Sequence, residues 1–74
     1  MKYSFAVCVR NQGYEVSLEL CKIYRVLPDL KAAQHHQIRV IDESGEDYLY
    51  PEKCFSKVAL PSETKEKLVE MTAA

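Results

Sequence analysis

Short apolar and β-branched runs, separated by turn residues about every eight to twelve positions, dominate the pattern along the chain. This spacing predicts a small all-β domain. Residues 3–10 form the first predicted strand, with Phe5 and Val7 on one face and Ala6 and Cys8 on the other. After a turn at Gly13, residues 14–20 alternate apolar and polar side chains, which predicts a second strand with one buried and one exposed face.

The middle of the chain predicts two further strands around a short helix. The first covers residues 22–27 and ends at Pro28, whose nitrogen has no hydrogen for a sheet. Asp29 is a suitable N-cap for a helical turn that runs to about His35 and His36. Residues 37–42 then return to the strand pattern.

Residues 38–50 give the clearest local signal, that of a β-hairpin. Glu43, Ser44 and Gly45 fit a three-residue loop in which Gly45 takes a left-handed conformation. The resulting register places Val40 opposite Tyr48 and Ile38 opposite Tyr50. Ile41 and Leu49 then lie on the other face, where we expect the C-terminal helix or a second subunit to cover them.

The last third of the chain predicts a 3₁₀ turn at 52–55, a strand at 56–60 and a helix after Pro61. Ser62 is the predicted N-cap, and Thr64, Leu68 and Met71 form its apolar stripe. We therefore expect a mainly β domain at 1–61, followed by a C-terminal helix or frayed tail at 62–74.

Composition limits the class of protein. The 74 residues, 47% hydrophobic and 28% charged, fit one small folded domain and exclude a disordered chain. The three cysteines are an odd set, which argues against a disulfide framework. No apolar run approaches the ~20 residues of a membrane span, and the N-terminal run is too short for a signal peptide. These features predict a cytoplasmic protein with reduced thiols.

Charge is balanced overall, at −1, but residues 42–52 contain five acidic side chains and no basic one. This pattern predicts an acidic hairpin. No basic stripe is visible, which makes nucleic acid an unlikely partner. An alternative function is still a small nucleic-acid-binding barrel that uses cations mostly in the N-terminal half: Lys2, Arg10, Lys22, Arg25, Lys31 and Arg39.

Two segments, 22–29 and 38–51, together with Phe55, carry a resemblance to a known group of proteins. They resemble small uncharacterised bacterial proteins with a Src-homology-3-like barrel, and the run from Gly45 to Pro51 is the most specific part. The resemblance implies a mainly β fold, a small five-stranded Src-homology-3-like barrel with a short C-terminal helix. Residues 49–55 also look like the end of a Src-homology-3 domain, where a proline and a 3₁₀ turn lead into the last strand. The chain has no Trp, so the resemblance implies the barrel but not recognition of proline-rich peptides.

Few residues are candidates for catalysis or metal binding. His35 and His36 are adjacent and distant in sequence from every cysteine, which is a poor spacing for zinc. Cys8, Cys21 and Cys54 have no activating motif and are typical of small buried side chains. The acidic residues of 42–47 lack the order of a calcium loop. We therefore expect no catalytic residue, no metal site and no cofactor.

The tyrosines are the most informative polar set, because a tyrosine combines a large apolar ring with a polar hydroxyl that suits interfaces. One interpretation is that they fill the interior of the barrel. The other is that Tyr14, Tyr24 and Tyr48, with Glu46 and Asp47, form a surface for a protein partner or a second copy of the chain. On the second interpretation the chain is a non-catalytic protein-interaction module that binds through an acidic hairpin and exposed tyrosines.

Overall fold

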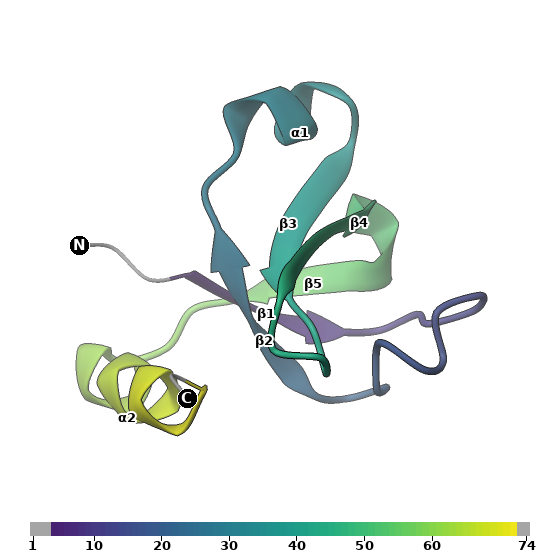
Figure 1. Ribbon diagram of the computed structural model, residues 1–74. Helices are drawn as coiled ribbons and strands as arrows, with labels where there is room; N and C mark the ends of the chain where they lie inside the picture. The colour runs from purple at the N-terminus through teal and green to yellow at the C-terminus, as the bar shows by residue number, and fades with distance from the viewer. Residues whose placement is uncertain (1–3, 73–74) are drawn as a thin grey trace.

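A computed structural model describes residues 4–72 as a mainly β fold (Figure 1). One antiparallel sheet has the strand order β4-β3-β2-β1-β5 and contains β1 (Ser4–Cys8), β2 (Ile23–Leu27), β3 (Gln37–Ile41), β4 (Asp47–Pro51) and β5 (Phe55–Val58). Helix α1 (Leu30–Gln34) connects β2 to β3, the 3₁₀ turn η1 (Glu52–Cys54) connects β4 to β5, and helix α2 (Ser62–Thr72) follows β5. The prediction of a five-stranded, mainly β domain with a short C-terminal helix is confirmed.

The sheet is not closed into a barrel, which differs from the expectation drawn from the sequence. Its edge strands β4 and β5 are not paired with each other in the described part of the chain. Pro51 ends β4, and a proline nitrogen cannot donate to a strand ladder. η1 follows immediately and turns the chain into β5, so the two edges stay apart.

The hairpin of β3 and β4 has the predicted register. Val40 pairs with Tyr48, and Ile38 pairs with Tyr50. The amide of Gly45 donates to the carbonyl of Asp42 at 3.0 Å, and Gly45 has a φ of +85°. The left-handed conformation predicted for Gly45 is therefore confirmed.

This conformation makes Gly45→Val a direct test of the loop. The space around an added Cβ is open, so the cost is the backbone strain of about 1–2 kcal/mol that an L-residue meets there. For a domain of this size we expect a fall in Tm of several degrees, about 4–8 °C per kcal/mol, in a thermal melt. Gly45→Asn is the matched control, because asparagine tolerates this conformation and should lose less. Equal melting curves for both variants and the parent would contradict the loop geometry.

Helix α1 begins as the sequence predicts. The side chain of Asp29 accepts a hydrogen bond from the amide of Ala32 at 2.9 Å, which is the expected N-cap contact. The helix ends at His35, and His36 follows with a φ of +57°, the left-handed conformation that commonly terminates helices. The carbonyl of His36 accepts from the amide of Glu52 at 3.0 Å, which ties the end of α1 to η1.

Residues 14–20 do not form the predicted strand. They belong to a long loop between β1 and β2 whose backbone is satisfied by local turns: Leu18 donates to the carbonyl of Tyr14 at 2.8 Å, and Asn11 donates through its amide side chain to Leu18 at 2.9 Å. The alternation of apolar and polar side chains in residues 14–20 therefore does not reflect pairing in the sheet. Leu18 is fully buried, whereas Val16 is 94% exposed.

The core lies on the inner face of the sheet, where Leu18 reaches it from the long loop. Tyr50 has edge-to-face contacts there with Tyr14, at a centroid distance of 5.1 Å, and with Phe55, at 6.4 Å. The core cluster comprises Ala6, Cys8, Leu18, Tyr24, Val40, Tyr50, Cys54 and Phe55.

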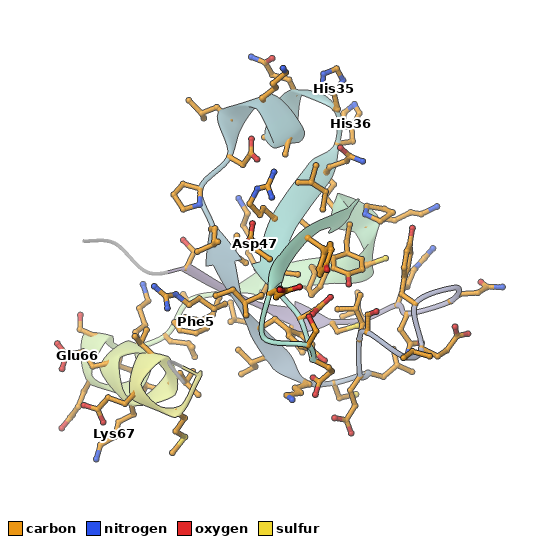
Figure 2. All side chains as sticks on the ribbon, viewed as in Figure 1. Phe5, His35, His36, Asp47, Glu66 and Lys67 are labelled. Atoms are coloured by element: carbon orange, nitrogen blue, oxygen red, sulfur yellow. The ribbon has the colours of Figure 1, made fainter. Side chains whose placement is uncertain are left out.

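One expectation about α2 is wrong and a second is not confirmed. Its half-buried positions are Lys65, Leu68 and Val69, whereas Thr64 and Met71 are exposed, so the apolar stripe is displaced from the predicted one. Figure 2 shows the helix beside Phe5, and Leu49 is 40% exposed, so the helix does not fully cover Leu49. Whether the helix covers Ile41 stays a prediction. Phe5, on the outer face of β1, is buried. Whether a second subunit covers Leu49 stays a prediction.

Candidate functional site

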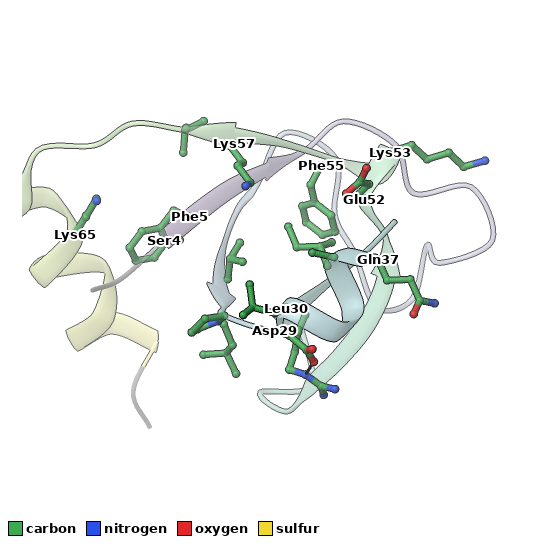
Figure 3. Close-up of a pocket in the computed structure, with 17 residues that line it drawn as sticks. Ser4, Phe5, Asp29, Leu30, Gln37, Glu52, Lys53, Phe55, Lys57 and Lys65 are labelled. Atoms are coloured by element: carbon green, nitrogen blue, oxygen red, sulfur yellow. Dashed lines mark hydrogen bonds and ion pairs between the residues drawn. The ribbon is translucent and has the colours of Figure 1, made fainter. Parts of the chain in front are cut away.

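A surface groove of about 640 Å³ opens between β5 and the segment that joins β2 to α1 (Figure 3). We call it the β5–α1 groove. Its volume is within the range of about 300–1,000 Å³ that is typical of binding sites. Residues from every strand except β4 line it, together with α1, η1 and α2: Ser4, Phe5, Val26, Leu27, Pro28, Asp29, Leu30, Ala33, Gln37, Ile38, Arg39, Glu52, Lys53, Phe55, Lys57, Val58 and Lys65.

The apolar part of the groove continues from the core. Phe55 belongs to the core cluster, and Val26 and Ile38 pack against it while also lining the groove. At the rim, Leu30 is 85% exposed. Because the sheet is open here, apolar side chains that a closed barrel would bury remain accessible to a ligand.

Asp29 and Arg39 form a fixed polar wall of the groove. Arg39 donates from Nε to Asp29 at 2.8 Å and from Nη1 to Asp47 on β4 at 2.9 Å. The Ala32 amide and the Arg39 guanidinium lower the pKa of Asp29, and Asp29 and Asp47 raise the pKa of Arg39. Asp29 is thus already committed to its helix cap and its ion pair.

Three lysines of the groove lining have a different environment. Lys53, Lys57 and Lys65 have no ion pair among the described residues. The second acidic residue of the lining, Glu52, lies 3.5 Å from the His36 imidazole. The groove consequently combines an apolar floor with three lysines that form no ion pair within residues 4–72.

The tyrosines predicted to bind a partner differ in their burial. Tyr24 is buried in the core, so the expectation of an exposed ring is wrong for this residue. Its hydroxyl donates to Glu43 and accepts from the Glu19 amide at 2.8 Å. Burial and the hydrogen bond to Glu43 raise the pKa of Tyr24. This contact joins the long loop to the β3–β4 hairpin.

The other predicted partner residues remain accessible. Tyr48 is 49% exposed and donates to Glu46 at 3.0 Å, a contact that raises the pKa of Tyr48. Tyr14 is about one-third exposed, and its ring is partly covered by the edge-to-face contact with Tyr50. Asp47, labelled in Figure 2, pairs with Arg39. Tyr48, Glu46 and Asp47 thus lie close together near the hairpin loop. None of the three lines the β5–α1 groove, although Asp47 contacts Arg39 of its lining.

Asp42 anchors the base of this hairpin. It is a buried carboxylate that accepts hydrogen bonds from the Tyr50 hydroxyl and from the amide and hydroxyl of Ser44. Burial opposes ionisation of Asp42, but the hydrogen bonds from Ser44 and Tyr50 outweigh it and lower its pKa. The same arrangement raises the pKa of Tyr50 to about 12, chiefly through burial.

A carboxyl whose pKa is lowered by folding stabilises the fold above its unfolded pKa, here about 3.8, and loses that contribution as the pH falls through the folded value. The free energy of unfolding should therefore decline below about pH 4. Asp42→Asn should cost ~1–3 kcal/mol at pH 7 and show a smaller decline in acid. Urea unfolding of both proteins at pH 7 and pH 3 measures this. Parallel pH profiles would show that the ionised Asp42 does not stabilise the fold.

The cations proposed for nucleic-acid binding differ in their surroundings. Lys22 pairs with Glu43 at 2.6 Å, and Arg39 pairs with Asp29 and Asp47. Arg10 and Lys31 are exposed, at the end of β1 and on α1 respectively. Lys2 lies outside the described residues. At least two of these side chains are thus already engaged by carboxylates.

Across residues 4–72, no group of three or more histidine, cysteine or acidic side chains is arranged to hold a metal ion. His36 is near Glu52, and both lie at the surface. Cys8, Cys21 and Cys54 are free thiols, and burial raises the pKa of Cys8, which disfavours its reactive thiolate form.

Sequence reasoning did not find the groove. Val26 and Phe55 were predicted only as strand and turn residues, and the lysines had no motif to connect them. The spacing of Lys53 and Lys57 around Phe55 is a weak local signal of a basic strand edge. The groove itself depends on β5 and α1 meeting across a long sequence separation.

Comparison with known protein families, with curated proteins and with solved structures finds no match for this chain. Within the described residues, neither helix has the length and apolar character needed to cross a bilayer. The functional argument therefore depends on the geometry of the groove and its charges.

Proposed function

We propose that the chain is a non-catalytic protein-interaction module that binds a segment of a partner protein in the β5–α1 groove. The observation that carries this proposal is the groove itself, whose floor is apolar: Val26 and Ile38 are half-buried there, beside the buried core residue Phe55. Accessible apolar surface with a polar rim is typical of protein interaction sites. The exposed Leu30 at the rim adds to that surface.

A Src-homology-3-like identity belongs to the same proposal. It is supported by the end of the sheet, where β4 finishes at Pro51 and η1 leads into β5. The five antiparallel strands are compatible with it, although the sheet is open. The free thiols of the described residues support a cytoplasmic location.

The acidic hairpin is a weaker candidate surface than the groove. Glu43 is engaged by Lys22 and Tyr24, and Asp47 is engaged by Arg39, so much of its charge is already compensated. Tyr48 and Glu46 stay available there for a partner or for a second copy of the chain. The groove combines a concave apolar floor with the exposed Leu30 at its rim and is therefore preferred.

Selection from a displayed library of random peptides tests the groove directly. Ala33 is an exposed residue of α1 that lines the groove, so Ala33→Tyr should obstruct it without disturbing the core. Gln34→Tyr is the matched control, because Gln34 is exposed on the same helix and does not line the groove. We expect peptides selected on the parent chain to bind Gln34→Tyr equally well and Ala33→Tyr at least ~10-fold more weakly, a loss of about 1.4 kcal/mol.

Two results would contradict the proposal. In one, the library yields no sequence that distinguishes Ala33→Tyr from Gln34→Tyr, which would place any binding elsewhere. In the other, a single-stranded oligothymidylate displaces the selected peptides at equal concentration, which would favour the alternative of nucleic-acid binding through the lysines.

A further inference from the structure

We propose that the β5–α1 groove takes an extended partner segment in which apolar residues are flanked by acidic ones, and that Lys57 binds one of the acidic side chains. This inference depends on the proposed function, because it specifies the chemistry of the segment that the groove binds. Four features of the groove support it: the direction of Lys57, the state of the neighbouring carboxylates, the apolar floor and the strand edge that forms one wall.

Lys57 projects from the inner face of the sheet. It pairs with Ala6 across β1 and β5, and residues directly opposite each other on paired strands point to the same side. Ala6 is fully buried in the core, yet Lys57 is exposed. Figure 3 shows the Lys57 side chain directed from β5 into the groove, on the same side as Phe55. A charged side chain thus extends over an apolar floor.

The protein supplies no anion for this lysine among its described residues. Asp29 is engaged by the Ala32 amide and by Arg39, and Glu52 lies beside His36. Lys53 at the η1 end and Lys65 on α2 add two more cations to the lining. The net unneutralised charge of the groove is therefore positive, and a complementary ligand carries carboxylates.

The shape of the groove favours an extended segment. β5 forms one wall and is an edge strand of the sheet, and edge strands commonly accept an added extended segment. Val26, Ile38 and Phe55 lie along the floor between the lysine-bearing elements. Apolar side chains can contact this floor while acidic residues on either side reach Lys57 and its neighbours.

The test compares the peptides selected on three proteins: the parent chain, Lys57→Glu and Lys67→Glu. Lys67 is exposed on α2 and does not line the groove, so Lys67→Glu matches the change in net charge. We expect aspartate and glutamate to flank the apolar residues of peptides selected on the parent and on Lys67→Glu. On Lys57→Glu the flanking positions should change to lysine and arginine.

Affinity gives the second measurement. Replacing the glutamates of the strongest selected peptide by glutamine should weaken its binding to the parent about fivefold, the effect of roughly one well-placed ion pair. The same replacement should have little effect on binding to Lys57→Gln, a variant that keeps a polar side chain, slightly shorter than lysine, without its charge. Thermal melts of Lys57→Gln and Lys57→Glu establish that both are folded.

The outcomes separate this inference from the proposed function. Peptides that depend on Ala33 but show no acidic preference, or a preference that Lys57→Glu leaves unchanged, would overturn the inference and keep the groove as a binding site. If no selected peptide depends on Ala33, both proposals are wrong. Acidic preference that reverses in Lys57→Glu supports both.

Discussion

Tyr50→Ala is expected to unfold the domain or to leave it barely stable. Tyr50 is buried, packs against Tyr14 and Phe55, and donates to the buried carboxylate of Asp42. Loss of a large buried aromatic ring costs ~3–5 kcal/mol, and a domain of this length has only about 4–11 kcal/mol of stability. The mutation also removes a hydrogen bond from Asp42, which adds to the loss.

Tyr48→Ala is the control for this prediction, because Tyr48 lies on the same strand and is half exposed. Its loss should cost less than ~1 kcal/mol, as for most surface substitutions. Thermal melts of the two variants compare their losses of stability. If Tyr48→Ala destabilises the protein as much as Tyr50→Ala, Tyr48 belongs to the core and cannot form part of a separate surface.

Leu18→Ala should be the second most damaging substitution, although Leu18 lies in a loop. Its side chain is fully buried in the core cluster, and its backbone holds the long loop through Tyr14 and Asn11. Truncation of a buried leucine costs ~2–5 kcal/mol, depending on how well the cavity collapses. We expect a strong fall in the midpoint of urea unfolding.

Val16→Ala provides the comparison within the same loop. Val16 is 94% exposed, so its truncation should change the unfolding midpoint very little. Were Leu18→Ala as harmless as Val16→Ala, the loop would not contribute to the core. Equal damage from both would instead indicate that the loop is a strand with one buried face, as its alternation suggested.

Elements governed by neighbouring residues could be predicted from the sequence. The β3–β4 register follows from the position of Gly45, and the start of α1 follows from Asp29, because a turn residue and a helix cap act over only a few positions. Pro51 and the short segment after it likewise define η1. Each of these predictions needed no knowledge of distant contacts.

The failures involve contacts between distant parts of the chain. Residues 14–20 alternate like a strand, but β1, the strand that precedes them, is already paired on both sides by β2 and β5. Tyr24, Tyr48 and Tyr50 are chemically the same, and only their positions in the sheet decide that Tyr48 is exposed and the other two are buried. Residue type alone therefore could not distinguish the buried Tyr24 from the exposed Tyr48.

The groove could not be predicted from the sequence for the same reason, because it depends on contacts between distant parts of the chain. Lys57 could be assigned to a strand, but its direction depends on pairing with Ala6, which lies far away in the sequence. Its lack of an acidic neighbour depends in turn on Arg39 engaging Asp29. These relationships exist only once the sheet and α1 are assembled.

The central claim is that a partner segment binds in the β5–α1 groove, and an NMR titration tests it most directly. Backbone amide shifts of the ¹⁵N-labelled chain are recorded while a peptide from the library selection is added. The account predicts that the largest shifts fall on the lining residues of β2, α1 and β5, with Leu27, Ala33 and Lys57 among them. Shifts confined to the hairpin around Glu46 and Tyr48, or to the long loop around Val16, would contradict it.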